Sequence, residues 1–528
     1  MDRRQFLKIS SASMAAMSLG GCAALGKAVS KKKPNIVFIF SDDHAVQTIS
    51  AYGSKVNTTP NIDRIAKNGV ALDRFFCCNS ICAPSRAAIL TGKHSHVNGQ
   101  MTNGVVFDGE QVTMPKLMQK AGYQTALIGK WHLRSDPTGF DYWQILPGQG
   151  CYYSPDFISA EGQKRYEGYA TDITTDFALQ WMDKRDKNKP FMLMCQHKAP
   201  HRTWAPAIRH LHLYDDIDIP EPDNLFDDYS GRIDALKDNE MSIENHMVYG
   251  YDLKVEGCKI KDALGRNFGN GELSRMTPDQ LKQWRAAYGP KNEKFMADYE
   301  SGKLKGKDLV RWKYQRYAKD YLRTIKAVDE NVGRVLDYLE ENDLADNTIV
   351  IYSSDQGFYV GDHGWYDKRW MYEESFRMPF LIQWPGVTKA GKTISSLAQN
   401  IDFAPTFLDA AGAEIPDEIQ GVSLRPILDG KAPKDWRKGL YYHYYERGEH
   451  HVPAHEGVRT DRYKLISFYD TNQWELFDLE KDPKEMKSVY NEKAYVPIRN
   501  MLLVELARLK KQYNVPENLN RRKPNVKQ

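Results

Sequence analysis

Four short apolar runs, each ending in polar residues, constrain the fold of this chain more than any other feature. They are "PNIVFIFSDD" from Pro34, "QTALIGKWH" from Gln124, "FMLMCQHKAPH" from Phe191 and "TIVIYSSDQG" from Thr348. Runs of this kind are typical of strands buried on both faces of a parallel sheet. Helical patterns separate them, such as the one beginning at Tyr321. We therefore predict an α/β fold with a doubly wound, mostly parallel sheet.

The carboxyl ends of these runs carry the residues that are best suited to chemistry. In a doubly wound sheet, ligands bind beyond the carboxyl ends of the strands. The polar residues at the four ends are Asp42, Asp43, Lys130, His132, His201, Asp355 and Gln356. We expect them to converge at one edge of the sheet.

The residue pairs at two of these ends, Asp42-Asp43 and Asp355-Gln356, indicate a metal site. Asp42, Asp43, Asp355 and the amide oxygen of Gln356 form an all-oxygen set, which suits Ca²⁺, with Mg²⁺ as the alternative. A single pair of this kind could instead cap the following helix. Two pairs at equivalent strand ends favour the metal, because buried carboxylates need neutralising partners.

Cationic side chains should surround the same edge. Arg86, Lys130 and Lys368, with His132 and His201 as proton carriers, could hold a tetrahedral oxyanion. A helix that begins near Pro84 would add backbone N–H donors. Each lysine or histidine taken singly is more often structural or solvated.

The N-terminal residues 1–22 read as an export signal, because a basic start precedes a short apolar stretch that cannot span a bilayer. Arg3-Arg4 resembles a twin-arginine signal. Leu19 to Cys22 resembles a lipoprotein cleavage box, with Cys22 as the lipidated residue and a possible membrane anchor. We expect an exported protein in the periplasm or cell envelope of a bacterium.

Length and charge set the remaining expectations. The 528 residues predict a catalytic domain over 34–430 with an insertion at about 215–307, an α+β subdomain over 431–516 and a tail over 517–528. In the subdomain, "GVRTDRYKLISFY" and "NQWELFDLEKDP" read as two antiparallel strands, followed by a helix from about Val496.

A net charge of +4 without a long basic run does not suggest nucleic acid as a partner. Seven cysteines are too few for a disulfide scaffold, and no C-x-x-C pair indicates structural zinc.

A five-residue signature carries a resemblance to a known family. Residues Cys82 to Arg86 read "CAPSR" and are followed by "TGK" from Thr91, which is similar to the signature of the type I sulfatases. The blocks "GYQTALIGKWHL", "KAPH", "SDQG", "DKRWMYEES" and "FDLEKDP" match further blocks of that family in order, between Pro34 and Pro483. The resemblance implies an alkaline-phosphatase-like fold and hydrolysis of sulfate esters. Gln356 departs from the Asn or His of many members but offers the same kind of oxygen as Asn.

The resemblance also implies roles for individual residues. Cys82 would be oxidised to formylglycine by a formylglycine-generating enzyme or an anaerobic sulfatase-maturing enzyme. The aldehyde hydrate would join the metal ligands, attack sulfur and leave a sulfate ester on the enzyme. His132 would then take a proton to release sulfate, while His201 and Lys368 would act on the leaving oxygen. Arg86 and Lys130 would hold the formylglycine and the sulfate.

The sequence constrains the identity of the substrate less than the type of reaction. "HKAPHRTWAP" and "HLHLYDD" resemble bacterial N-acetylglucosamine-6-sulfatases, and sulfatases of algal polysaccharides such as ulvan or carrageenan share much of this pattern. Alternatives of another class are a phosphatase or phosphodiesterase of the alkaline-phosphatase superfamily and a non-catalytic glycan-binding protein. Asp367 and Arg369, which flank Lys368, are expected to bind the sugar. His455 is expected to do so from a loop that also holds His450 and His451, unless these histidines are only solvated.

Overall fold

The computed structural model describes residues 32–517 and residue 519. The predicted signal with Cys22 and most of the predicted tail therefore lie outside the described residues. Within the described part of the chain, no helix combines the length and apolarity needed to cross a membrane.

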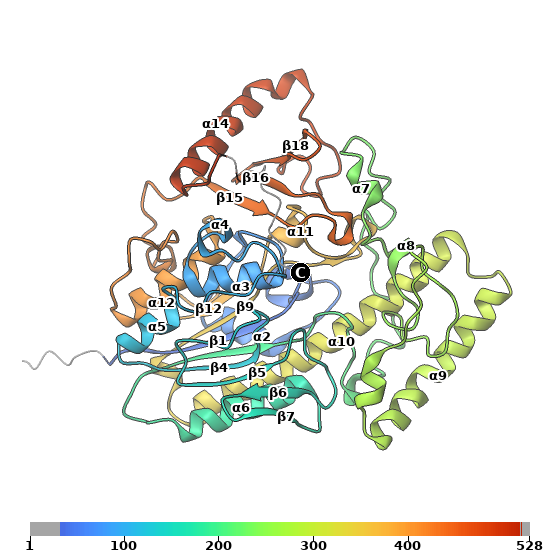
Figure 1. Cartoon of the computed structure of the whole chain (residues 1–528), viewed down its shortest axis with the longest axis horizontal. Coiled ribbons are helices and arrows are strands. Elements are labelled where there is room, and N and C mark those ends of the chain that lie inside the picture. The colour runs from blue at the N-terminus through green and yellow to red at the C-terminus, as the bar shows by residue number, and fades with distance from the viewer. Residues whose placement is uncertain (1–31, 518, 520–528) are drawn as a thin grey trace, which may run out of the picture. The chain divides into compact units, whose positions relative to one another are not determined.

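A ten-stranded sheet forms the centre of the fold, in the order β13-β2-β12-β9-β1-β8-β4-β5-β6-β7 (Figure 1). Its five middle strands are parallel: β9 (Thr348–Ser354), β1 (Asn35–Ser41), β8 (Phe191–His197), β4 (Gln124–Lys130) and β5 (Tyr142–Leu146). The flanking strands are β12 (Phe380–Gln383), β2 (Val70–Leu72), β13 (Lys392–Ile394), β6 (Asp156–Ser159) and β7 (Gly162–Arg165). Each of the four apolar runs forms one of the middle strands, so the predicted fold class is confirmed.

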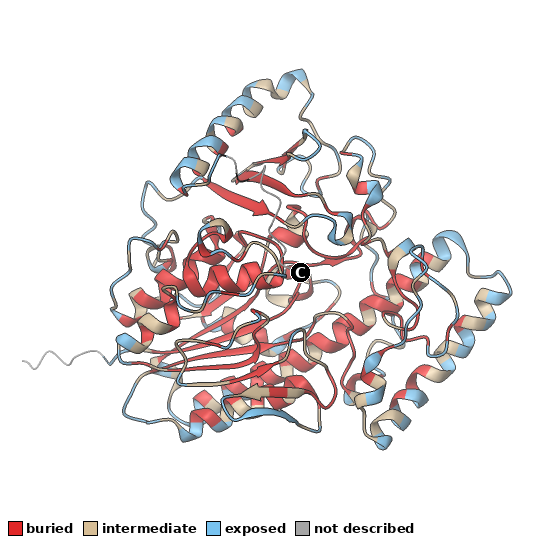
Figure 2. Ribbon diagram, viewed as in Figure 1, coloured by how far each residue is buried: buried red, intermediate tan, exposed pale blue. Residues whose placement is uncertain are grey.

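Helices cover both faces of this sheet, because alternate residues of each strand point to opposite faces. Ile36 and Phe38 of β1 pack with α3 (Cys82–Thr91), α5 (Met114–Lys120) and α12 (Phe403–Ala411). Val37 and Ile39 pack on the other side with α2 (Pro60–Asn68), α6 (Ala170–Lys184) and α10 (Gly306–Glu341). Strands β1, β8 and β9 are buried along their whole length (Figure 2). Their composition reflects this two-sided burial.

The C-terminal part contains a four-stranded antiparallel sheet and a helix, as expected for an α+β unit. Its strands are β15 (Gly439–Tyr444), β16 (His455–Thr460), β17 (Tyr463–Phe468) and β18 (Gln473–Asp478), and α14 (Val496–Gln512) packs on one face. The other face, including Tyr442 and Phe477, joins the main core. The prediction of two strands was wrong. The stretch taken as the first strand is a hairpin, in which Thr460 Oγ1 accepts the Tyr463 N–H and closes the turn.

The predicted insertion at about 215–307 holds the 23-residue helix α9 (Pro278–Glu300). Thr277 and Gln280 form a capping box, a sequence signal for a helix start that was overlooked. Phe295 of α9 packs with Tyr314 on the first half of α10. Helix α10 itself begins at Gly306, four turns before the pattern noted from Tyr321.

Short elements complete the described part of the chain. They are β3 (Phe75–Phe76), β10 (Tyr359–Val360), β11 (Tyr366–Asp367), β14 (Ala398–Gln399), α4 (Ser95–Asn98), α7 (Ala235–Asp238), α8 (Ile243–His246), α11 (Glu373–Phe376) and α13 (Arg425–Leu428). The 3-10 turns are η1 (Val46–Thr48), η2 (Ser50–Tyr52), η3 (Ile208–His210), η4 (Gly271–Arg275), η5 (Ala345–Asn347), η6 (Asp362–Gly364), η7 (Asn400–Asp402), η8 (Glu449–His451) and η9 (Lys493–Tyr495).

Candidate active site

The register of the parallel strands brings the four polar ends together. Ser41, the last residue of β1, pairs with Ser354 of β9 and with His197 of β8. Gly129 of β4 pairs with Gln196. Each strand therefore stops at the same level, and the residues that follow lie along one edge of the sheet.

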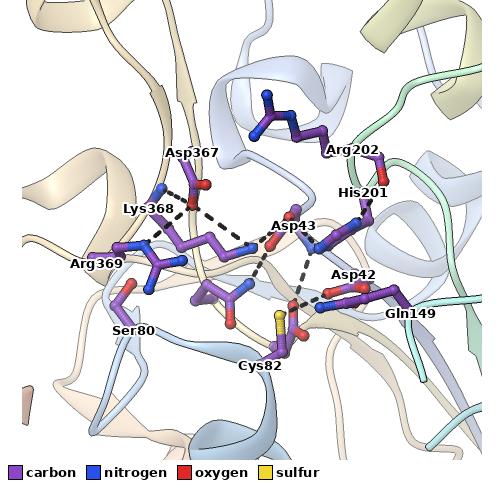
Figure 3. A network of polar contacts seen from close by, with 12 residues as sticks. Asp42, Asp43, Ser80, Cys82, Gln149, His201, Arg202, Asp367, Lys368 and Arg369 are labelled. Atoms are coloured by element: carbon purple, nitrogen blue, oxygen red, sulfur yellow. Dashed lines mark hydrogen bonds and ion pairs between the residues drawn. The ribbon is translucent and has the colours of Figure 1, made fainter. Parts of the chain in front are cut away.

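Cys82 lies at the start of α3, which is buried along its whole length (Figure 2). Its Sγ is 3.4 Å from Oδ1 of Asp42 (Figure 3). The N–H of Ala83, in the first turn, donates to Oδ1 of Asn103 at 3.0 Å. Burial raises the pKa of the Cys82 thiol to about 12, so the unmodified thiol stays protonated at neutral pH.

Three carboxylates beside Cys82 form a compact acidic cluster. Asp42, Asp43 and Asp355 each offer an oxygen within 4.8 Å of the others, and all three are buried. Gln356 donates its Nε2 hydrogen to Asp43, and its buried Oε1 has no hydrogen-bond partner among the described residues. Burial raises the pKa of Asp43 to about 7. These oxygens fit a hard divalent cation, which would neutralise the carboxylates and satisfy the amide oxygen.

Three cations contact the acidic cluster. Lys368 Nζ is 2.7 Å from Oδ2 of Asp43, and Lys130 Nζ contacts Asp42. Arg86 directs two nitrogens at Oδ2 of Asp355, at 3.2 and 3.1 Å.

By formal charge the three basic side chains balance the three carboxylates, while burial lowers the pKa of Lys130 and raises that of Asp43. Burial would raise the pKa of Asp355, but Arg86, Lys130 and Lys368 outweigh it and hold that pKa below its usual range. A bound divalent cation would therefore leave the site positive, as recognition of an anionic ester requires.

Two histidines border this cluster. Burial lowers the pKa of His132 to about 2, and the charge of Lys130 adds to the effect. His132 Nδ1 is buried without a partner in the described structure, at a backbone φ of 58°. His201 donates Nδ1–H to the carbonyl oxygen of Arg202 at 2.7 Å, which leaves Nε2 3.7 Å from Oδ2 of Asp43 (Figure 3). Burial also lowers the pKa of His201, so both imidazoles are neutral at pH 7.

The predicted sugar-binding residues on either side of Lys368 are held in place by other elements. Asp367 accepts the Lys368 N–H at 2.8 Å, and its Oδ2 is 3.3 Å from Nε2 of His450. Arg369 donates to Glu446 at 3.1 Å and lines a pocket of about 640 Å³.

His455 does not lie on a loop at the site, as was expected. It is the first residue of β16, has no exposed surface, and stacks against Trp370 and Tyr442. Direct contact with a sugar is therefore ruled out for this structure. His450 on η8 is the histidine that reaches Asp367, whereas His451 points to Glu240, 3.4 Å away.

Sequence reasoning missed several polar residues around the site. Gln149, in the loop after β5, accepts a hydrogen bond from Lys130 at 2.5 Å and lines the same pocket as Arg369. It could have been found, because β5 is a further parallel strand whose carboxyl end faces the same edge. Lys198 follows β8 directly and donates to the Arg202 carbonyl at 3.1 Å. No local sequence pattern marks Glu446 as a site residue, because only the packing of the C-terminal sheet brings it close to Arg369.

Two family models match this chain. The model described as "Sulfatase" matches residues 34–413. The model described as "N-sulphoglucosamine sulphohydrolase, C-terminal" matches residues 361–512. Together they span the ten-stranded sheet, the site and the C-terminal sheet.

Individual proteins of known name are also similar. An N-acetylglucosamine-6-O-sulfatase of Bacteroides thetaiotaomicron is 50% identical over 509 residues, which cover 95% of this chain and 90% of the relative. The human N-acetylglucosamine-6-sulfatase is 25% identical over 462 residues, covering 81% and 71%. A solved structure, described as a complex with its substrate D-glucosamine-2-N,6-O-disulfate, is 48% identical with a TM-score of 0.89, covering 93% of this chain and 100% of that one.

Proposed function

The chain belongs to the sulfatase family, and from that premise we propose that it removes the 6-O-sulfate of an N-acetylglucosamine-type or glucosamine-type residue in a sulfated glycan. The observation that carries this proposal is the 50% identity, over 95% of the chain, to a relative named for that activity. The site is compatible with it, because buried carboxylates and cationic side chains surround Cys82.

Formylglycine made from Cys82 is the proposed nucleophile. The hydrate of that aldehyde supplies a hydroxyl oxygen at the start of α3, next to Asp42. The proposed maturation partner is a formylglycine-generating enzyme or an anaerobic sulfatase-maturing enzyme. Buried Arg86 and Lys130 fix the position of this residue and pair with sulfate oxygens through charge-assisted bonds.

Members of this family use a divalent metal, and we propose Ca²⁺ for this chain. Asp42, Asp43, Asp355 and the partnerless Oε1 of Gln356 would hold it, together with the modified Cys82. When bound, the cation polarises sulfate oxygens and favours ionisation of a neighbouring hydroxyl.

The two histidines are proposed to move protons on opposite sides of the sulfur. Neutral His132 accepts a proton from the second hydroxyl of the hydrate through its free Nδ1. His201 acts at the leaving oxygen through Nε2, since its Nδ1 is committed to the Arg202 carbonyl. The negative charge of the bound ester favours the protonated imidazole. Lys368 stabilises the oxygen as its charge develops.

Asp367 and Arg369 are proposed to bind the sugar. Asp367 can accept hydrogen bonds from sugar hydroxyls, and Arg369 can donate to ring substituents. Both are nearly buried; Arg369 lines the pocket that Glu446 and Gln149 also line, and Asp367 Oδ1 lies 3.8 Å from Nε of Arg369.

A panel of defined sulfate esters tests this function. We expect the mature enzyme to release sulfate from 6-O-sulfated N-acetylglucosamine or glucosamine saccharides faster than from 3-O-sulfated or N-sulfated isomers. Oligosaccharides of ulvan and carrageenan, phosphate monoesters and phosphate diesters serve as comparisons. Faster turnover of any of these would contradict the proposal, and binding without turnover would indicate a glycan-binding protein.

We also propose that the protein is exported and anchored to a bacterial envelope through a lipid on Cys22. The support is the order of the twin-arginine-like and lipoprotein-like motifs within residues 1–22. Labelling cells with a palmitate analogue should mark the wild-type protein and leave the Cys22→Ala protein unmarked. Equal labelling of the two, or none of either, would contradict lipidation.

A further inference from the structure

The side chain of Arg202 turns away from Cys82, although its backbone adjoins His201 (Figure 3). Its guanidinium makes a two-pronged pair with Asp252, at 2.7 Å from Nε and 2.6 Å from Nη2. Asp252 has no exposed surface, and its Oδ2 also accepts the N–H of Val248 at 2.8 Å. Because both oxygens of the carboxylate are engaged, the orientation of the guanidinium is fixed.

The same guanidinium lies between two aromatic rings. Its central carbon is 5.3 Å from the ring centroid of Tyr251 and 5.3 Å from that of Tyr366. Tyr251 belongs to the insertion, whereas Tyr366 is in β11, two residues before Lys368. Arg202 therefore joins the loop of His201, the insertion and the strand that leads to Lys368.

The backbone carbonyl of Arg202 lies on the side of the site and contacts two of its residues. Its carbonyl oxygen accepts His201 Nδ1–H at 2.7 Å and the Lys198 ammonium at 3.1 Å. His201 and Lys368 both approach Oδ2 of Asp43, at 3.7 and 2.7 Å. The position of the guanidinium thus sets the position of the carbonyl that orients His201 and its separation from Lys368.

We propose that Arg202 and Asp252 are positioning residues, which hold His201 and Lys368 on the leaving-group side of the substrate. This role rests on the proposed function, because it acts through the proposed proton donor His201. Neither residue needs to touch the substrate. The insertion that supplies Asp252 then contributes to catalysis through this pair.

A double-mutant cycle with His201 tests the proposal on the 6-O-sulfated saccharide, or on whichever sulfate ester the wild-type enzyme hydrolyses. We expect Asp252→Asn to lower kcat about 100-fold, since misplacement near 1 Å has effects of this size. The same change should lower kcat less than about threefold when His201 is already alanine, because the two residues act as one unit. Equal losses in both backgrounds would overturn the proposal, since a merely structural role is additive.

Failure of the proposed function gives a different result. Wild-type enzyme that hydrolyses no sulfate ester, or His201→Ala enzyme with full activity, contradicts the function before Asp252 is considered. The matched control is Asp172→Asn, which breaks the two-pronged pair with Arg209, at 2.7 and 2.8 Å, away from the site. This control should retain wild-type kcat.

A second variant covers the case in which an unpaired buried charge prevents folding. The double change Arg202→Met with Asp252→Leu removes both charges together, which buried pairs tolerate better than loss of one partner. Folded enzyme of this kind should show the same loss of kcat as Asp252→Asn, again only when His201 is present. Wild-type kcat in the folded double variant would overturn the proposal.

Discussion

Burial determines the chemistry that single residues in this site can perform. The pKa of Cys82 is raised to about 12, so the unmodified thiol stays protonated at neutral pH, whereas the proposed formylglycine hydrate would carry hydroxyls. His132 and His201 are kept neutral by burial and by nearby cations, which suits groups that exchange protons with a bound anion. The function of each residue therefore depends on its surroundings as much as on its type.

Replacing Cys82 by alanine should abolish sulfate release while the protein stays folded, because only one buried atom is removed. The loss follows from the absence of any nucleophile. Mass spectrometry of the peptide that contains residue 82 should detect formylglycine in active wild-type enzyme. A fully active preparation in which this peptide carries only cysteine would contradict the mechanism.

Replacing Asp367 by alanine should lower kcat/KM for the glycan about 100-fold and affect a small aryl sulfate far less, because binding energy from the sugar is lost. Paired kinetics on the two substrates measure this difference. His455→Phe is the control, since it keeps the aromatic stack with Trp370 and should spare glycan turnover. Equal losses on both substrates after Asp367→Ala would assign Asp367 to the core reaction or to folding.

At the scale of elements, the ends of β1 and β9 create the proposed metal site, and a helix cap lies at the start of α9 in the insertion. The parallel pairing of Ser41 with Ser354 places Asp42 and Asp43 beside Asp355 and Gln356, directly after the two strands. In the insertion, by contrast, a local sequence signal specifies the start of a helix: Thr277 caps α9.

Chelation should abolish activity and lower the thermal unfolding midpoint, and added Ca²⁺ or Mg²⁺ should restore both. A cation present at 100 times its Kd stabilises the folded state by about 2.7 kcal/mol. Calorimetry and sulfate release, measured before and after metal is returned, test this. Recovery with Zn²⁺ alone would reject the oxygen-ligand assignment.

Thr277→Ala should lower the free energy of unfolding by about 1 kcal/mol, because the first turn of α9 loses the hydroxyl that accepts the Gln280 N–H. The thermal unfolding midpoint measures this, and sulfatase activity should not change. Ser274→Ala is the control, since its hydroxyl donates only to the nearby Gly271 carbonyl. Equal midpoints for the two variants would argue against the cap.

At the scale of the whole molecule, a buried ionic network ties the C-terminal sheet to the segment that carries Lys368. Lys464 of β17 pairs with Glu373 of α11 at 2.9 Å and with Glu485 at 2.7 Å. Arg459 of β16 pairs with the same Glu373 at 3.2 Å. The C-terminal sheet and the segment that carries Lys368 therefore form one unit around these charges.

His363 in this region should make stability depend on pH. It is fully buried, with Nδ1 2.8 Å from Asp227 and Nε2 3.7 Å from Glu374. Burial opposes its charge, but these carboxylates raise its pKa from 6.5 to about 9. A raised folded-state pKa gives stability that is complete below pH 6.5 and lost as pH rises through 9, on the order of 3 kcal/mol.

His363→Gln should therefore lower the unfolding midpoint strongly at pH 6 and much less at pH 9.5. Thermal unfolding of both proteins at the two pH values measures the difference. The exposed His212 serves as control, because His212→Gln should have little effect at either pH. A constant difference between wild type and His363→Gln across this range would show that the charge of His363 is not involved.

The sequence by itself determined the four central strands and a helix near Pro84, which begins at Cys82, and it predicted the all-oxygen set, because these are properties of short contiguous stretches. An apolar run reports burial on both faces, and the polar residues that follow it mark a carboxyl end. Parallel pairing then brings those ends to one edge, so Asp43 and Gln356 meet although 313 residues separate them. The helix α9 was also within reach of sequence, through its capping box.

Only the tertiary structure decided which side chains from distant parts of the chain lie around Lys368 and its neighbours. Glu446 reaches Arg369, and His450 reaches Asp367, because the C-terminal sheet packs against the main core. His455 is close to His450 in sequence but is buried, because strand pairing turned it inward. Such contacts depend on the pairing of distant segments, and no local pattern of residues encodes them.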